Sequence, residues 1–178
     1  MEEKELIKGL KRSKEEAYDE LINLYGNKLL RTCFLINKDE KEAEDIVQET
    51  FIKVFNSIKK FKGDSSLYTW IYRILQNTIK DRYRNNILTT PYEDYTASED
   101  NMEEIVIDKE NRKILKEELD KINFIYKQVI VLFYFDDLSI KEISQVLDEK
   151  EGTIKSKLSR GRKMLAENLI KGGEINGL

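Results

Sequence analysis

The side chains best suited to acid–base or metal chemistry are carboxylates that follow one another closely: Glu42, Glu44, Asp45 and Glu49. Helical proteins that hold two metal ions use such carboxylates, but they combine them with a Glu-x-x-His motif, and this chain has no histidine. The sequence also lacks a Gly-x-x-x-x-Gly-Lys phosphate-binding loop and a plausible pair of nucleophile and base. We therefore expect no catalytic residues, metal or cofactor, and keep a carboxylate-bridged metal enzyme as a remote alternative.

A second group of polar residues, between residues 138 and 165, has the chemistry of DNA recognition. Two amphipathic segments are joined there by a turn at residues 148–151, and the second places its apolar residues within one narrow helical arc, namely Ile154, Leu158, Gly161 and Leu165. The opposite arc carries Lys155, Ser156, Ser159, Arg160 and Lys163. Hydroxyls and cations on an outward face suit base edges and phosphates, so the pattern predicts a helix-turn-helix module. The alternative is a solvated helical hairpin with a lysine-rich exterior.

A third polar set lies on a helix expected over residues 67–84, where Arg73, Asn77, Lys80 and Arg84 recur on one face. Asparagine can pair with a base edge while arginine and lysine hold phosphates, although a solvated face would show the same pattern. The preceding turn, residues 61–68, mixes aromatic, glycine and hydroxyl residues that suit an unstacked base or simply cap the helix.

A fourth set is acidic and includes one exposed apolar residue. Asp45, Gln48, Glu49 and Ile52 project away from the buried stripe of a helix expected over about residues 39–58. This arrangement suits a protein partner with a basic surface, and a solvated acidic face with one stray isoleucine is the alternative.

Apolar spacing predicts the helices that position these groups. The first long helix is expected over about residues 14–36 with Leu21, Leu24 and Leu29 in its apolar stripe, and it packs with the next two into one lobe. Helical spacing returns at about residues 103–122. The apolar run 129–135 fits a buried strand by residue type, but its helical neighbours and the lack of a partner strand favour a helix. The expected fold class is all-α.

The net charge of −3 is unusual for a DNA-binding protein until it is divided along the chain. Residues 1–90 carry 17 basic and 15 acidic groups, residues 91–120 carry 4 and 11, and residues 121–178 carry 10 and 8. Periodicity is lost after Arg84, and the single proline, Pro91, follows. These features predict two small helical domains, residues 1–88 and 111–178, joined by an acidic linker at residues 89–110.

Cysteine usage and the N-terminus indicate the compartment. Cys33 is the single cysteine, which excludes an intramolecular disulfide and fits a reducing environment. The first residues are charged, and no apolar run approaches the roughly 18 to 20 residues that span a bilayer. We expect a cytoplasmic protein without membrane insertion.

Three segments together resemble the extracytoplasmic-function sigma factors of the bacterial sigma-70 family. They are EAEDIVQETF at residues 42–51, SLYTWIYRI at residues 66–74 and EGTIKSKLSRGR at residues 151–162, in the family's order and separation. The resemblance covers nearly the whole chain. It implies a region 2 domain at residues 1–88, the linker, and a helix-turn-helix region 4 domain at residues 111–178.

The resemblance also implies a partner for each surface. The residues implied to bind RNA polymerase core are Asp45, Gln48, Glu49 and Ile52. Those implied to recognise and help open the minus-ten element are Lys62, Ser65, Ser66, Tyr68, Arg73, Asn77, Lys80 and Arg84. Those implied to read the minus-thirty-five element are Thr153, Lys155, Ser156, Ser159, Arg160 and Lys163. The implied function is promoter-specific transcription initiation without catalysis, commonly under an anti-sigma factor. The main alternative is a free-standing helix-turn-helix regulator that binds an operator without polymerase.

The chain departs from the family pattern in three places. Ile122 and Asn123 replace the usual Leu-Pro before region 4, and Ser144 replaces the usual alanine. Residues 148–150, Asp-Glu-Lys, replace the usual Gly-Ile-Ser of the helix-turn-helix turn. Since aspartate tolerates left-handed backbone better than most residues, we expect the turn to survive with different packing.

Overall fold

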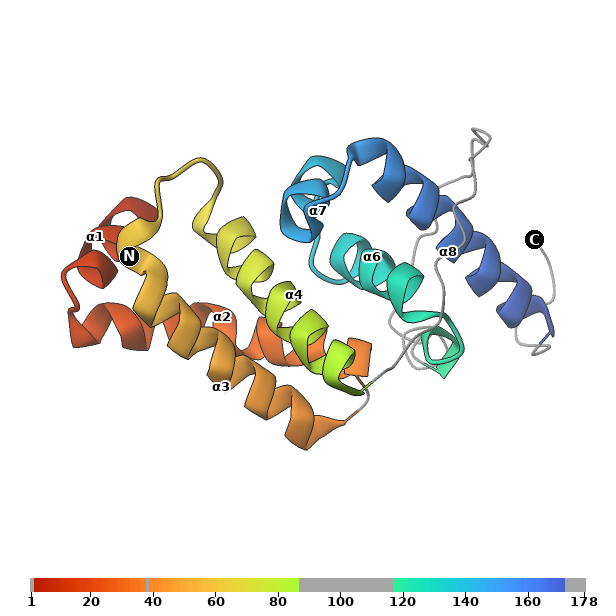
Figure 1. The fold of residues 1–178 in the computed structure, drawn as a ribbon, viewed down its shortest axis with the longest axis horizontal. Coiled ribbons are helices and arrows are strands. Elements are labelled where there is room, and N and C mark those ends of the chain that lie inside the picture. The colour runs from red at the N-terminus through yellow and green to blue at the C-terminus, as the bar shows by residue number, and fades with distance from the viewer. Residues whose placement is uncertain (1, 38, 87–116, 172–178) are drawn as a thin grey trace. The chain divides into compact units, whose positions relative to one another are not determined.

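The structure is a computed structural model that describes residues 2–37, 39–86 and 117–171, and every regular element in those ranges is a helix (Figure 1). The all-α prediction is confirmed. The chain divides into two compact units: residues 1–90 together with residues 144–148, and residues 91–143 together with residues 149–178. We describe the helices up to residue 86 first and those from residue 117 onward second.

The first unit contains α1 (Glu3–Lys11), α2 (Glu15–Asn37), α3 (Glu40–Ser57), the short 3-10 helix η1 (Ile58–Lys60) and α4 (Leu67–Asn86). Helix α2 packs against α1 and α3, and α3 packs against α4. The helices predicted near residues 14–36, 39–58 and 67–84 are therefore confirmed, and α1 is an addition. The largest fully buried side chains include Leu21, Leu29, Ile46, Leu67, Ile71 and Tyr72.

One predicted core position in α2 is wrong. Leu21 and Leu29 are buried as expected, but Leu24 is 44% exposed. Leu24 lies at the edge of the apolar arc of the helix, beyond the stretch that the neighbouring helices cover. The apolar spacing thus identified the correct buried face of α2 but overestimated its width by including Leu24.

The second unit contains α6 (Phe124–Tyr134), the first half of α7 (Ile140–Leu147) and α8 (Glu151–Lys171), and α6 packs against α8. The apolar run 129–135 is therefore helical through Tyr134, as expected. The predicted linker at residues 89–110 lies outside the described residues, as does most of the helix predicted at residues 103–122. Residues 117–119 are helical, and Leu119 and Ile122 are buried.

The two helix starts in this unit depend on polar caps. Asn123, where the family has proline, accepts a hydrogen bond from the Ile125 backbone N–H at 3.2 Å and caps α6. Ser139 and Glu142 form a reciprocal capping box before α7: Ser139 N donates to Glu142 Oε2 at 2.9 Å, and Glu142 N donates to Ser139 Oγ at 3.3 Å. Asparagine thus supplies a helix start by another route than proline.

The turn between α7 and α8 keeps its shape by a different means than the family pattern. Asp148 adopts φ 57°, the left-handed geometry that glycine usually provides. Glu149 replaces the usual apolar anchor with an ion pair: both of its carboxylate oxygens accept hydrogen bonds from Lys157 Nζ, at 2.7 and 2.6 Å. Lys157 lies within α8 and is only 8% exposed, so the ion pair is largely shielded from solvent on the lysine side. The expectation that the turn survives with altered packing is confirmed.

Replacing Asp148 by glycine should stabilise the protein by roughly 0.5 to 1 kcal/mol, because glycine adopts positive φ without steric strain. Asp148→Ala is the matched control and should destabilise it, since alanine has neither that freedom nor a side chain that bonds locally. Urea unfolding of the two variants measures both effects. If Ala and Gly have the same effect, the left-handed backbone at this turn is not under strain.

Gly161 lets α6 and α8 approach closely. A Cβ atom there would lie 2.8 Å from Ile130 Cδ1 and 3.4 Å from Tyr126 Cβ. We predict that Gly161→Val weakens the packing of these helices by about 2 kcal/mol, seen as faster hydrogen exchange of the α6 and α8 amides. Gly152→Val is the control on the same helix, because a Cβ there meets no atom within 4 Å. Equal amide exchange rates in the two variants would contradict this prediction, because the core would then accommodate the added methyl groups at no cost.

Candidate nucleic-acid and protein interfaces

Helix α3 presents a mixed acidic and apolar face. Asp45 and Gln48 are exposed, Glu49 is half-exposed, and Ile52 is 51% exposed. At 100° per residue these four side chains fall on one side of α3, while Ile46, Val47 and Thr50 are buried on the other. The structure thus brings the four residues together on one accessible surface, which we call the α3 face.

The carboxylates of the α3 face already have cationic neighbours. Arg82, on α4, donates from Nη2 to Glu49 Oε2 at 3.1 Å and lies 3.9 Å from Asp45. Lys53 Nζ lies 2.9 Å from Glu49 Oε1 and 3.9 Å from Asp81. The hydrogen bond from Lys53, followed by that from Arg82, lowers the pKa of Glu49 below its ordinary value even though partial burial opposes the shift. The sequence did not indicate Arg82, because pairing between helices leaves no local pattern, whereas Lys53 stands four residues after Glu49 on the same helix, a spacing that the sequence does show.

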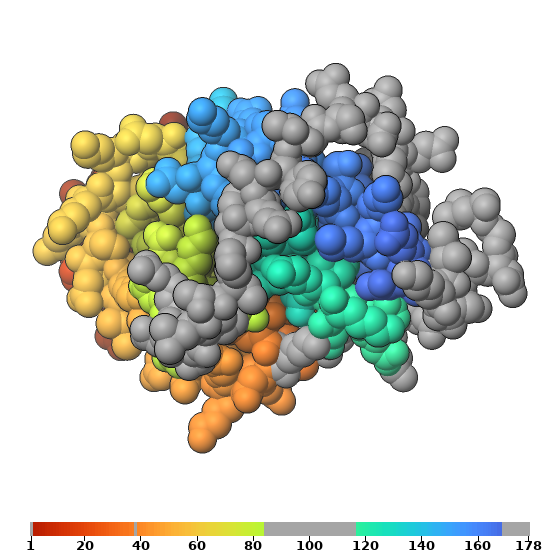
Figure 2. All heavy atoms as spheres, turned by 45° about the vertical axis from the view of Figure 1, so that its right-hand side comes forward, coloured from red at the N-terminus to blue at the C-terminus, as the bar shows by residue number. Residues whose placement is uncertain are grey.

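The connection from η1 to α4 is a polar turn held at its ends. Gly63 has φ 84°, so it occupies the left-handed region. Ser66 caps α4: its Oγ accepts from Thr69 N at 3.1 Å and lies 2.8 Å from Thr69 Oγ1. Lys62 and Asp64, on either side of Gly63, are exposed, and Figure 2 shows this yellow connection projecting from the surface.

Aromatic side chains gather beside this turn. The Tyr68 ring lies 4.5 Å from that of Tyr72 and 5.9 Å from that of Tyr25, and Lys28 Nζ lies 5.5 Å from the Tyr68 centroid. Burial, with Glu3 nearby, raises the pKa of Tyr25. Trp70 is half-buried, and its ring lies 5.1 Å from that of the buried Phe61. Tyr68 is therefore half-buried in a ring cluster.

The outward residues of α4 and α8 are accessible to different degrees. Arg73 and Asn77 are exposed and Lys80 is intermediate, while the side chain of Arg84 lies outside the described residues. On α8, Lys155 and Lys163 are exposed, and Thr153, Ser156, Ser159 and Arg160 are intermediate. Figure 2 shows α8, in the deeper blue, at the surface. Its inner side is the predicted one, with Ile154, Leu158 and Leu165 buried.

Two further cations of α8 serve packing. Lys157 is held by Glu149, and the Arg162 guanidinium carbon lies 5.5 Å from the centroid of the Phe133 ring and 5.6 Å from that of Tyr134. Among the α8 side chains that the structure describes, the outward cations are the exposed Lys155 and Lys163 and the half-buried Arg160, which are the three cations that spacing assigned to the outward arc.

Comparison with known proteins matches both units. The model of sigma-70 region 2 matches residues 21–87, and that of sigma-70 region 4 matches residues 112–165. The ECF RNA polymerase sigma factor SigW of Bacillus subtilis is 31% identical over 179 residues, which cover 93% of this chain and 96% of SigW. The chain belongs to the extracytoplasmic-function sigma factors of the sigma-70 family. The ECF RNA polymerase sigma-E factor of Haemophilus influenzae is also 31% identical, over 93% of each chain.

Solved structures share the fold of this sigma factor. CnrH, solved in complex with the cytosolic domain of CnrY, has a TM-score of 0.72 at 21% identity and covers 95% of this chain and 97% of its own. The sigma factor RpoE of Bartonella quintana, solved with the anti-sigma factor NepR, has a TM-score of 0.66 at 21% identity, over 86% of this chain and 96% of its own. The region 2 match contains α3, α4 and most of α2, whereas α1 precedes it.

Two other expectations concern metals and membranes. Among the residues that the structure describes, no three His, Cys, Asp or Glu side chains gather closely enough to hold a metal ion. Asp45 and Glu49, the carboxylates with most potential for such a site, instead have Arg82 and Lys53 beside them. Within the described ranges, every helix of the sigma factor is too short or too polar to cross a bilayer.

The ion pairs of Glu49 predict a pH effect. A group whose pKa is lowered on folding contributes stability above its unfolded pKa and loses that contribution as the pH falls through the folded pKa. The difference in melting temperature between wild type and Glu49→Gln should therefore be largest near neutral pH, shrink as the pH falls below about 4.3, the ordinary glutamate pKa, and vanish below the lowered pKa of folded Glu49. The effect should be modest because the side chains of Glu49, Lys53 and Arg82 are 38%, 38% and 35% exposed. Thermal unfolding across pH tests this; a constant difference would contradict it.

Proposed function

We propose that this sigma factor binds RNA polymerase core through the α3 face and reads promoter DNA through α4 and α8. In this proposal residues 1–88 bind core and recognise and open the minus-ten element, residues 89–110 are the linker, and residues 111–178 read the minus-thirty-five element. The protein itself performs no chemistry. It selects where polymerase starts, and it acts in the cytoplasm.

The observation that carries the proposal is the separation of surface chemistry between helices. The α3 face combines carboxylates with an exposed isoleucine, which favours a protein partner with cations and an apolar site. The outward sides of α4 and α8 combine cations with amide or hydroxyl groups, which favours DNA. Acidic groups on one helix and DNA-binding groups on two others support simultaneous binding of polymerase and promoter.

Transcription in vitro with purified RNA polymerase core tests the proposal. A library of promoter fragments with randomised upstream and downstream elements is transcribed by core alone and by core with the sigma factor. We expect new, sequence-dependent start sites only when the protein is present. If it neither binds core nor changes start-site choice, the proposal fails.

DNA binding by the isolated protein distinguishes a sigma factor from a free-standing regulator. Such a protein would bind its operator tightly without core, usually as a dimer on a palindromic site. A sigma factor of this kind should instead show weak, non-specific binding to duplex DNA when alone, because its net charge of −3 opposes attraction to phosphates. Nanomolar, sequence-specific binding by the isolated protein would favour the regulator.

An anti-sigma factor is a further proposed partner. The RpoE of Bartonella quintana was solved with the anti-sigma factor NepR, and CnrH was solved with the cytosolic domain of CnrY; both share the fold of this chain. We propose that such a protein covers surfaces needed for core binding. A purified candidate should displace core from the sigma factor in a competition assay, and simultaneous binding of both would contradict that role.

A further inference from the structure

We propose that α1, which precedes the residues matched by the region 2 model, positions the minus-ten recognition loop. The loop is defined here as residues 61–66, and Glu3 and Lys11 hold its two ends. The inference rests on the proposed function of that loop. It assigns Glu3 and Lys11 as positioning residues that set how strictly the loop discriminates between DNA bases.

Glu3 holds the downstream end of the loop. Its Oε1 accepts a hydrogen bond from the backbone N–H of Leu67, the first residue of α4, at 3.1 Å. The first N–H groups of a helix have no partner within the helix, and a carboxylate there also interacts favourably with the helix dipole. Ser66 satisfies a different group, the N–H of Thr69. The start of α4 therefore has one cap from its own chain segment and another from 64 residues earlier.

Lys11 holds the upstream end. Its Nζ donates to the backbone carbonyl oxygen of Phe61 at 2.7 Å and lies 5.9 Å from the centroid of the Phe61 ring. Phe61 is 5% exposed and packs on Trp70. A charged donor on a carbonyl beside a buried ring fixes both the backbone and the side chain of the residue from which the loop begins.

Helix α1 is itself firmly placed, so it can act as a support. Leu6 and Leu10 are 1% and 0% exposed. Gly9 lets α1 lie close to α2, because a Cβ at Gly9 would lie only 2.7 Å from the Cβ of Ala17. The α1 helix also contacts η1, which leads into the loop. Glu3 and Lys11 are thus attached to packed structure and not to a loose end.

The middle of the loop differs from its ends. Lys62, Gly63 and Asp64 are exposed, and Gly63 adopts a left-handed backbone conformation. A loop with fixed ends and an open centre presents one shape to a ligand, whereas a loop released at both ends samples several and loses discrimination between similar ligands. The contacts of α1 therefore bear on specificity for the minus-ten element, and not on the affinity of the α3 face for polymerase.

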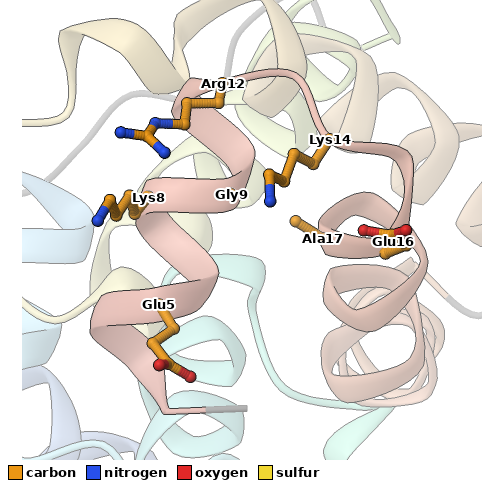
Figure 3. A pocket seen from close by; sticks show the side chains of 7 residues that line it. All are labelled: Glu5, Lys8, Gly9, Arg12, Lys14, Glu16 and Ala17. Atoms are coloured by element: carbon orange, nitrogen blue, oxygen red, sulfur yellow. The ribbon is translucent and has the colours of Figure 1, made fainter.

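The test compares two double variants of α1 in the full-length protein with RNA polymerase core. Glu3→Ala with Lys11→Met removes both loop contacts. Glu5→Ala with Lys8→Met makes the same changes of residue type at exposed positions that line a surface hollow between α1 and α2, as Figure 3 shows. Transcription of a promoter library randomised at the minus-ten element gives, for each protein, the ratio of output from the best sequence to that from its single-base variants.

We expect that ratio to fall about tenfold in Glu3→Ala/Lys11→Met, the order of one lost charge-assisted hydrogen bond, and to stay unchanged in Glu5→Ala/Lys8→Met. Core affinity should stay within twofold of wild type in both. Hydrogen exchange at residues 62–67 should accelerate only in the first variant. Glu3→Gln with Lys11→Arg keeps an acceptor and a donor, should fold as wild type does, and should retain most of the discrimination.

An unchanged ratio in a folded Glu3→Ala/Lys11→Met protein would overturn the inference, and so would an equal loss in Glu5→Ala/Lys8→Met. If Glu3→Ala/Lys11→Met does not fold, single Glu3→Ala and Lys11→Met variants replace it, and unchanged ratios in both would likewise overturn the inference. Failure of the proposed function is a separate result, because wild-type protein would then fail to bind core or to select start sites.

Discussion

Reversing the charges of Asp45 and Glu49 together, as Asp45→Lys and Glu49→Lys, should weaken binding to RNA polymerase core by about a hundredfold. Two acids that face a basic partner become two bases, and they also lose Arg82 as a neighbour of opposite charge. The fold should persist, because exposed ion pairs of this kind contribute only about 0 to 1 kcal/mol each. Titration of labelled protein with core measures the affinity, and circular dichroism checks the fold.

Glu40→Lys with Glu44→Lys is the matched control for this experiment. It also replaces two acidic residues four positions apart by lysine, but at exposed positions on another side of α3. We expect core affinity within a fewfold of wild type. If both double variants lose affinity equally, net charge and not the α3 face determines binding; if neither does, core binds elsewhere.

Replacing Arg160 by alanine should lower transcription about tenfold from promoters that depend on the upstream element, since a base contact by arginine contributes about 1 to 3 kcal/mol. The loss should depend on the base at one position of that element, as transcription of an upstream-randomised library would show. Lys141→Ala, at an exposed position on α7, is the control and should change little. An equal loss on every promoter would make Arg160 a phosphate contact.

The fold was predictable where sequence spacing is strong. The apolar stripes that place α2, α3 and α4 repeat over several turns, so the helices were identified to within a few residues. At Asp148 the residue type alone indicated that left-handed backbone would be tolerated. Helix α1 was missed because nine residues are too few for a periodic signal, and isolated helices of that length are unstable. Its stability comes from burial of Leu6 and Leu10 against the rest of the first unit.

The candidate interfaces likewise contain features that the sequence predicts and contacts that it does not. Spacing alone placed the α3 face and the outward arc of α8, since both are periodic features of one helix. It did not reveal that Arg82 bonds Glu49 across 33 residues, or that Glu3 bonds Leu67 across 64. Such contacts depend on how helices pack and leave no trace in local composition. The roles of individual site residues stay predictions until the variants are measured.

The ion pairs around Glu49 have a consequence for how polymerase is found. Asp45, Glu49 and Asp81 stand beside Lys53 and Arg82, so the five charged groups leave a net charge of only −1. At separations beyond the Debye length, about 8 Å in physiological salt, such a cluster exerts little pull on a basic partner. Long-range steering from this patch is therefore weak, and its association rate with core should depend little on ionic strength. In the proposed complex, recognition would therefore begin at contact, where a cation of the partner would take the place of Arg82.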